Sequence, residues 1–169
     1  MWTLCCKLAG AAALVVCGAM AGSLCAGALA RRRRFYAELV LLCERLLDNA
    51  RYLREPLPAF FARLAGDESL ALLAVDFDPR RQSFADWRAA FGARLCALVP
   101  LPEAERQALR DFWQSLGEGG TPQEGERLEY CRRRFAAAGE AAAQMEKERA
   151  RLCRSLGICG GAAAAILLL

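Results

Sequence analysis

The chain contains no histidine among its 169 residues, so it lacks the side chain that most often serves as a catalytic acid or base. None of its nine cysteines forms a Cys-x-x-Cys pair, and without histidine a zinc site has no support. The sequence also lacks the Gly-x-x-x-x-Gly-Lys-Ser/Thr phosphate loop and the Gly-x-Ser-x-Gly nucleophile turn. We therefore expect a protein that is not an enzyme and has no catalytic residue, cofactor or metal.

A large excess of one charge is missing as well. The net charge is +4, but five of the 23 basic residues, Lys7 and the run Arg31 to Arg34, precede residue 35. The remaining 18 basic residues are balanced by all 19 acidic ones. Arg132 to Arg134 lie among glutamates, so this run is interpreted as a solvated helix face. The balance predicts no nucleic-acid partner.

No stretch alternates with period two for long enough to predict a strand, whereas apolar residues recur at helical spacing along most of the chain. The predicted fold is all-α, a bundle of about six helices on a membrane anchor. The expected helices cover about 34–53, 57–65, 67–75, 83–98, 102–116 and 121–155. The apolar stripe of the first of these helices is expected to include Leu39, Leu42, Leu46 and Leu53. Aromatic residues at 60, 61, 84, 87, 91, 112, 113 and 135 lie on apolar stripes and are predicted to form the core.

Local signals mark several of these boundaries. Pro56 ends the first helix, because proline lacks a backbone donor and restricts the residue before it. Ser83 followed by Asp86 resembles a capping box. Thr121 and Glu124, with proline between them, are typical of a helix start. The longest helix is therefore expected to begin at Thr121.

The N-terminal segment, residues 1–30, is predicted to be a transmembrane helix. Residues 8–30 carry no charge, and roughly 20 apolar residues suffice to cross the hydrocarbon core. Arg31, Arg32, Arg33 and Arg34 follow this segment and predict a cytoplasmic side for what comes next. Two alternatives are a cleaved signal peptide, which would make the protein secreted, and lipidation at Cys17 or Cys25. Nothing interrupts the pattern after residue 30, so the helix is expected to continue into the bundle.

The C-terminal segment, residues 155–169, also has no charge. As a helix it would reach about 22 Å, whereas the hydrocarbon core is about 30 Å thick. Arg149, Arg151 and Arg154 precede it, as a second basic cluster on the same side of the bilayer. We therefore expect a short second transmembrane segment and a cytoplasmic bundle over residues 31–154.

The segment 146–161 reads Glu-Lys-Glu-Arg-Ala-Arg-Leu-Cys-Arg-Ser-Leu-Gly-Ile-Cys-Gly-Gly. With the apolar tail, it resembles the C-terminus of the stage III sporulation protein AB family. Further features agree in order: an N-terminal apolar helix followed by basic residues, Arg51-Tyr52 before Pro56-Leu57-Pro58, and Leu116-Gly117 before the last helix. The likeness runs nearly end to end. One departure is the loop Glu118-Gly-Gly-Thr-Pro, where the family often has Ser-Asp or Thr-Asp.

The resemblance implies a component of the channel complex that endospore-forming bacteria build between mother cell and forespore. The cytoplasmic domain of this family is similar to that of the inner-membrane platform protein of type II secretion and type IV pilus machines. The implied partners are the secretion-type ATPase of the complex, stage III sporulation protein AA, its other membrane subunits and the lipid bilayer. The implied location is the mother-cell membrane around the forespore.

The turns at 53–58 and 117–124 are expected to lie far from the bilayer, because the first helix leaves the membrane and the last returns to it. We predict that exposed charged residues near these turns contact the ATPase: Arg51, Arg54, Glu55, Glu118 and Glu124. The alternative is a structural scaffold that binds only other membrane subunits, with the bundle as a spacer.

Overall fold

The structure is a computed structural model that describes residues 2–117 and 121–168. Within these ranges it does not describe the side chains at 2–9, 11, 12, 14, 15, 121, 122, 154, 157, 158, 161, 162 and 164–168. The chain divides into two compact units. We call residues 1–33 with 140–169 the paired-helix unit, and residues 34–139 the bundle unit.

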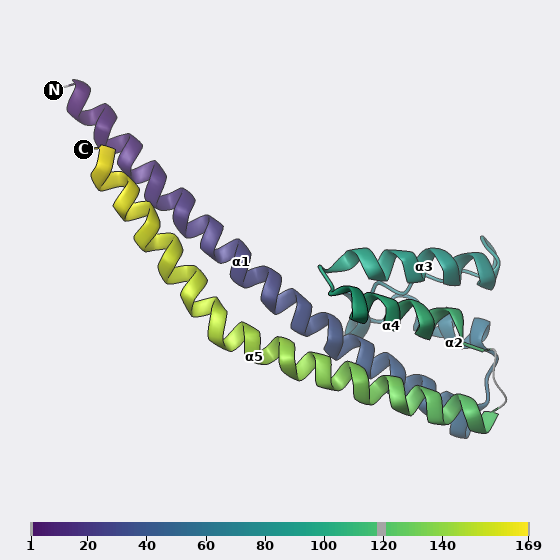
Figure 1. Cartoon of the computed structure of the whole chain (residues 1–169). Helices are drawn as coiled ribbons and strands as arrows, with labels where there is room; N and C mark the ends of the chain where they lie inside the picture. The colour runs from purple at the N-terminus through teal and green to yellow at the C-terminus, as the bar shows by residue number, and fades with distance from the viewer. Residues whose placement is uncertain (1, 118–120, 169) are drawn as a thin grey trace. The chain divides into compact units, whose positions relative to one another are not determined.

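The described residues form five α-helices and no strand, so the all-α prediction is confirmed, with one α-helix fewer than expected (Figure 1). The α-helices are α1 (Trp2–Asp48), α2 (Leu57–Leu64), α3 (Phe84–Leu98), α4 (Glu103–Gln114) and α5 (Thr121–Leu168). A π-helical turn, η1 (Asn49–Leu53), follows α1, and a 3-10 turn, η2 (Glu68–Leu70), follows α2. The expected continuation of the N-terminal segment into the first helix is confirmed by α1.

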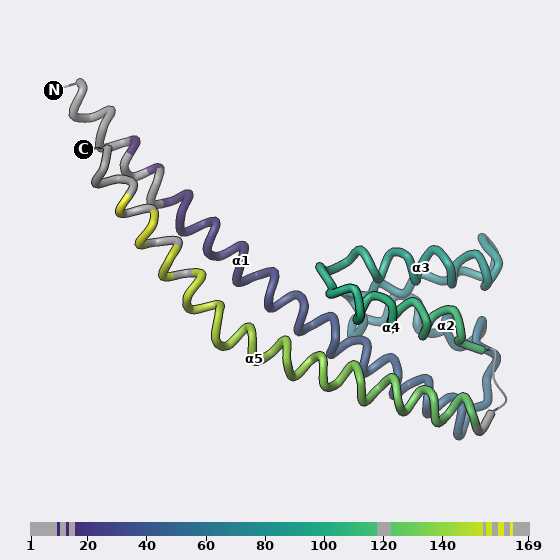
Figure 2. The backbone as a smooth tube through the Cα atoms, viewed as in Figure 1, coloured from purple at the N-terminus to yellow at the C-terminus, as the bar shows by residue number. Residues whose placement is uncertain are grey.

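The predicted helix signals operate as expected in the bundle unit. Ser83 accepts a hydrogen bond from the Asp86 backbone N–H at 3.2 Å and caps α3. Gly117 ends the segment after α4 with a positive φ of 86°, which favours glycine over residues with a side chain. Helices α3 and α4 pack against each other within this unit (Figure 2).

Aromatic side chains form the centre of the bundle unit. Trp87 stacks on Phe91 with ring centroids 4.7 Å apart and lies 5.0 Å from Phe61. Phe61 in turn lies 5.9 Å from Trp113. These separations suit aromatic pairs, each of which adds about 0.5–1.5 kcal/mol beyond burial of area. The predicted aromatic core is confirmed, except that Phe84 is only half-buried.

The predicted third α-helix, over 67–75, is wrong. Asp67 does cap a turn by accepting from the Ser69 N–H at 2.8 Å, but regular structure ends with η2 at Leu70. The backbone N–H groups of Leu72 and Leu73 donate to the carboxylate of Glu38 on α1, at 2.8 and 3.0 Å. A side chain distant in sequence therefore provides the acceptor that a helical carbonyl would have supplied.

The apolar stripe expected along the first helix does not extend to its end. Leu46 is 2% exposed, whereas Leu53 is 60% exposed. Between them α1 gives way to η1, in which the wider π-helical turn changes the angle between successive side chains. The inward placement of Leu53 that the regular spacing predicted is therefore wrong.

In the paired-helix unit, α1 and α5 lie side by side and antiparallel. Arg33 pairs with Glu146 at 3.1 Å, and the Sγ atoms of Cys25 and Cys153 are 3.0 Å apart. The small residue Ala26 is 4% exposed, which agrees with a close approach of the two helices.

In the residues that the structure describes, no helical stretch is both long and apolar enough to span a bilayer. Many side chains of the predicted segments 8–30 and 155–169 lie outside the described set. The two predicted membrane segments therefore remain predictions.

We predict that Glu38→Ala lowers the free energy of unfolding by about 2 kcal/mol or more, because it leaves the backbone N–H groups of the half-buried Leu72 and the buried Leu73 without their acceptor. Glu126→Ala, at an exposed position of α5, is the control and should change stability by less than about 0.5 kcal/mol. The measurement is denaturant unfolding of the full-length chain in detergent, followed by the fluorescence of Trp87 and Trp113. Equal stability of the two variants would contradict the role given to Glu38.

Candidate functional site

The turn after α1 is held by one buried amide side chain. Asn49 is 4% exposed; its Nδ2 donates to the carbonyl of Glu55 at 2.9 Å, and its Oδ1 accepts from the Glu55 N–H at 3.1 Å. The Arg54 N–H donates to the Asn49 carbonyl at 2.6 Å, and Arg54 takes a positive φ of 51°. These contacts reverse the chain before Pro56 and fix the geometry of residues 50–55.

This fixed turn presents two large apolar side chains to solvent. Tyr52 is 77% exposed and Leu53 is 60% exposed, and the arginines on either side of them are exposed too. We call Arg51, Tyr52, Leu53 and Arg54 the turn patch. The patch carries two positive charges around an apolar centre.

The second turn, before α5, lies against the first. A Cβ added to Gly117 would lie 2.9 Å from Cδ1 of Leu57, so the two segments are in contact. The Gly117 N–H donates to Oε1 of Glu124 at 2.9 Å, and the Ser115 carbonyl accepts from Arg127. The Glu124 carboxylate therefore binds the backbone of Gly117, seven positions earlier in the chain. In a capping box it would instead bind the backbone N–H three positions earlier.

A groove of about 220 Å³ lies between the two turns. It brings together three of the five predicted contact residues, Arg54, Glu55 and Glu124. Its full lining is Leu46, Asn49, Ala50, Arg54, Glu55, Leu57, Glu124 and Leu128. The sequence predicts only that these charged residues lie near two turns, and their role in binding stays a prediction.

The other two predicted contact residues lie elsewhere. Arg51 lines a neighbouring open groove of about 400 Å³, together with Glu44, Leu47, Asp48, Glu129, Arg132 and Arg133. Glu118 is outside the described residues. The expectation that all five are exposed is wrong for Glu55 and Glu124, which are half-buried. Glu55 accepts from Arg63 at 3.1 Å, and Glu124 accepts from Gly117, so both carboxylates have structural tasks.

Charge in the groove beside Arg51 is compensated. Glu129 accepts hydrogen bonds from Arg132 at 2.7 Å and from Arg133 at 3.3 Å. The hydrogen bond from Arg132, followed by that from Arg133, lowers the pKa of Glu129 to about 2, so this carboxylate is charged at neutral pH. Arg132 also lies 3.7 Å from Glu44. The lining of this groove therefore carries three acidic and three basic side chains, Arg51 among them, so its charges balance.

The predicted membrane-flanking arginines fall in both units. Arg31 and Arg33 belong to the paired-helix unit, as do the exposed residues Arg149 and Arg151. Arg34 belongs to the bundle unit and donates to Glu38 at 2.9 Å. Arg32 is half-buried, and the side chain of Arg154 is outside the described set.

Metal ligands do not gather in the part of the chain that the structure describes. Residues 2–117 and 121–168 contain no group of three or more His, Cys, Asp or Glu side chains placed to hold an ion, insofar as these side chains are described.

Sequence reasoning missed the exposure of the two apolar residues of the turn patch. Leu53 was assigned to the buried stripe, and Tyr52 was noted only as part of the Arg51-Tyr52 pair. Their exposure depends on η1 and on the Asn49 contacts, neither of which has a local sequence signal.

We predict that Asn49→Ala loosens the turn and lowers the free energy of unfolding by about 1–3 kcal/mol, because the backbone donor and acceptor of the half-buried Glu55 lose their partner. Amide hydrogen exchange should accelerate at Arg54 and Glu55 in the full-length chain. Arg51→Ala, an exposed change in the same turn, is the matched control and should leave both amides unchanged. Unaltered exchange in Asn49→Ala would show that this side chain does not hold the turn.

Comparison with known proteins gives one match. The family model described as stage III sporulation protein AB matches residues 7–169, nearly the whole chain. No curated protein and no solved structure matches. The match confirms the resemblance found in the sequence and implies a role in sporulation. The chain therefore belongs to the stage III sporulation protein AB family.

Proposed function

We propose that this protein is a non-enzymatic membrane platform of the sporulation channel complex and that it docks the secretion-type ATPase, stage III sporulation protein AA, through the turn patch. The observation that carries the proposal is the exposure of Tyr52 and Leu53 between two arginines on a turn that Asn49 holds in place. Family membership supports the sporulation role. The docking role rests on the patch and on the resemblance to secretion platform proteins.

The composition of the patch suits a protein partner. Residues that dominate binding energy at interfaces are enriched in tyrosine and arginine and lie at the centre of a contact. Tyr52 supplies a large rigid ring, and Arg51 and Arg54 supply donors for carboxylates of the partner. An acidic rim around an apolar pocket on the ATPase would complement the patch.

The paired-helix unit is the proposed membrane anchor. Its register places position 25 of α1 beside position 153 of α5, and position 33 beside position 146. Both helices rise by about 1.5 Å per residue, so the same register continues along the pair. The uncharged tail, which starts at position 155, then lies beside the part of α1 that precedes about position 24. The apolar parts of both helices then overlap, and the arginines follow on one side. This arrangement supports a membrane hairpin with the bundle unit in the cytoplasm.

A structural scaffold is the alternative, in which the paired-helix unit binds other membrane subunits and the turn patch has no partner. The glycines at 10, 18, 22 and 27 would suit close helix packing in a membrane. Charge reversal in the turn patch separates the two functions, because it should disturb docking and leave membrane assembly intact.

We predict that Tyr52→Ala weakens binding of the ATPase by about 2 kcal/mol, roughly thirtyfold, because a central aromatic anchor is lost. Arg51→Glu should also weaken binding of the ATPase, and the loss should grow as the salt concentration falls. At low salt, the repulsion between the new glutamate and an acidic rim on the ATPase is less screened. Tyr130→Ala is the matched control, since Tyr130 is 63% exposed on α5 and outside the patch. The measurement is a titration of the full-length chain in detergent with the purified ATPase. No association of the unaltered chain at high micromolar concentration, or equal binding by both tyrosine variants, would refute docking through the patch.

The membrane hairpin has a separate test. A cysteine added after Leu169, in a chain whose other cysteines are replaced by serine, should resist a membrane-impermeant thiol reagent applied from the cytoplasmic side. A cysteine placed at the exposed position of Glu126 should react from that side. Reaction of the terminal cysteine with the cytoplasmic reagent would contradict the second transmembrane segment.

A further inference from the structure

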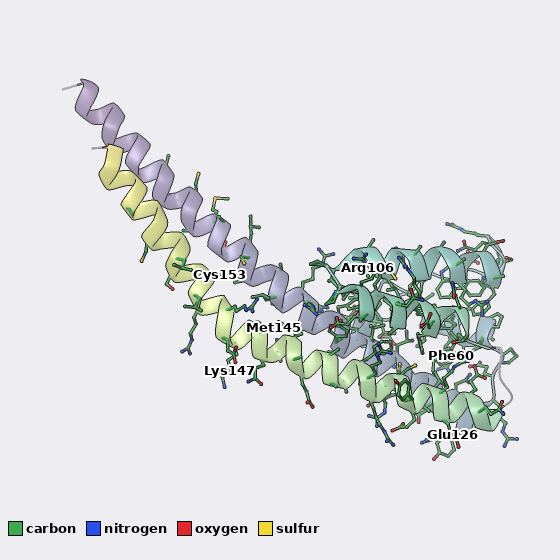
Figure 3. All side chains as sticks on the ribbon, in the orientation of Figure 1. Phe60, Arg106, Glu126, Met145, Lys147 and Cys153 are labelled. Carbon is green, nitrogen blue, oxygen red and sulfur yellow. The ribbon has the colours of Figure 1, made fainter. Side chains whose placement is uncertain are left out.

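Two thiols from opposite ends of the chain meet in the paired-helix unit. Cys25 of α1 and Cys153 of α5 have their Sγ atoms 3.0 Å apart, although 128 positions separate them in sequence. Figure 3 labels Cys153 on α5. A disulfide bond is about 2.05 Å long. A small change in the two side-chain torsions would therefore bring the sulfurs to bonding distance.

The surrounding contacts hold the two helices in this register. Arg33 and Glu146 form an ion pair at 3.1 Å two turns farther along α1. Ala26, the neighbour of Cys25, is 4% exposed, and Ala142 on α5 is 2% exposed. Small buried residues allow helix backbones to approach closely, as two cysteines need in order to join across a helix pair.

The rest of the protein does not enclose the two thiols, so an apolar reagent dissolved in lipid or detergent can reach them. Cys25 is exposed and Cys153 is half-buried, whereas Cys43 in the bundle unit is fully buried. Burial raises the pKa of the Cys43 thiol, which keeps it protonated and inert. The hydrogen bond with Cys25 raises the pKa of Cys153, so its oxidation needs a reactive disulfide.

We propose that Cys25 and Cys153 are a redox modification site, at which a low-molecular-weight disulfide joins α1 to α5 through a reversible disulfide bond. One thiol loses its proton and its thiolate attacks the reagent, R–S–S–R. This step forms a mixed disulfide and releases R–S⁻, which takes up a proton. The second thiolate then attacks the protein sulfur of the mixed disulfide and releases a second R–S⁻. Two protein thiols are oxidised, and one reagent disulfide is reduced to two R–SH.

The cross-link would connect the first and last helices covalently in the unit proposed as the anchor. It would hold the two helices in one register without using any residue of the turn patch. The inference is therefore independent of ATPase docking, and either can fail without the other.

The test treats the full-length chain in detergent with 4,4′-dithiodipyridine, an apolar disulfide, and maps the products by mass spectrometry. We expect a peptide in which Cys25 is joined to Cys153, release of two thiopyridones for this pair and no adduct left on either residue. Dithiothreitol should restore both thiols. Cys153→Ser should leave a stable thiopyridine adduct on Cys25. Cys43→Ser is the control and should leave the cross-link unchanged.

Three results would overturn the proposal. In the first, Cys25 and Cys153 of one molecule each retain a thiopyridine adduct. In the second, neither residue reacts although Cys159 does. In the third, a mixture of ¹⁵N-labelled and unlabelled chains yields Cys25–Cys153 peptides that combine both labels, which would place the bond between two molecules.

Discussion

The bundle unit depends on the rule that buried polar groups must be hydrogen-bonded. Among the described residues, Glu38 and Asn49 are the buried polar side chains, and both belong to the first long helical stretch of the chain. Glu38 binds the backbone of the segment after α2, and Asn49 binds the backbone of the turn before α2. Each of these side chains hydrogen-bonds backbone groups that have no partner within a regular helix. Two irregular segments of this unit, around Leu72 and around Glu55, are therefore held by these side chains, and loss of either leaves backbone groups without their partners.

The same two contacts explain where sequence reasoning succeeded and failed. Helices whose boundaries are local, such as α3 with its Ser83 cap, were predicted closely. The segment 67–75 carries local helix signals too, yet Leu72 and Leu73 bind Glu38, more than 30 positions away. No local pattern encodes that partner. The predicted burial of Leu53 is wrong for a related reason, because one π-helical turn shifts the apolar stripe without any change in residue type.

The candidate site was predicted in part. Charge and turn position led to Arg54, Glu55 and Glu124, and these residues do line one groove. The same argument treated the three residues as equivalent. In the structure, two of them already accept hydrogen bonds within the protein: Glu55 from Arg63 and Glu124 from Gly117. Exposure of Tyr52 could not be predicted, because helical periodicity gives the direction of a side chain only while the helix stays regular. Sequence thus located the turns, and tertiary contacts decided which side chains remain available.

A rigid turn matters for binding because association costs the entropy of ordering flexible groups, about 0.5–1.5 kcal/mol for each side chain with many rotamers. Tyr52 has few rotatable bonds, and the two hydrogen bonds between Asn49 and Glu55 already fix the backbone beside it. The entropy cost of ordering this turn is therefore met when the chain folds, and not when a partner binds. The arginines on either side are exposed, and charges at the edge of a contact contribute more to attraction and orientation than to affinity. An apolar anchor on a preordered turn, with exposed charges around it, is the arrangement expected of a surface that captures a partner.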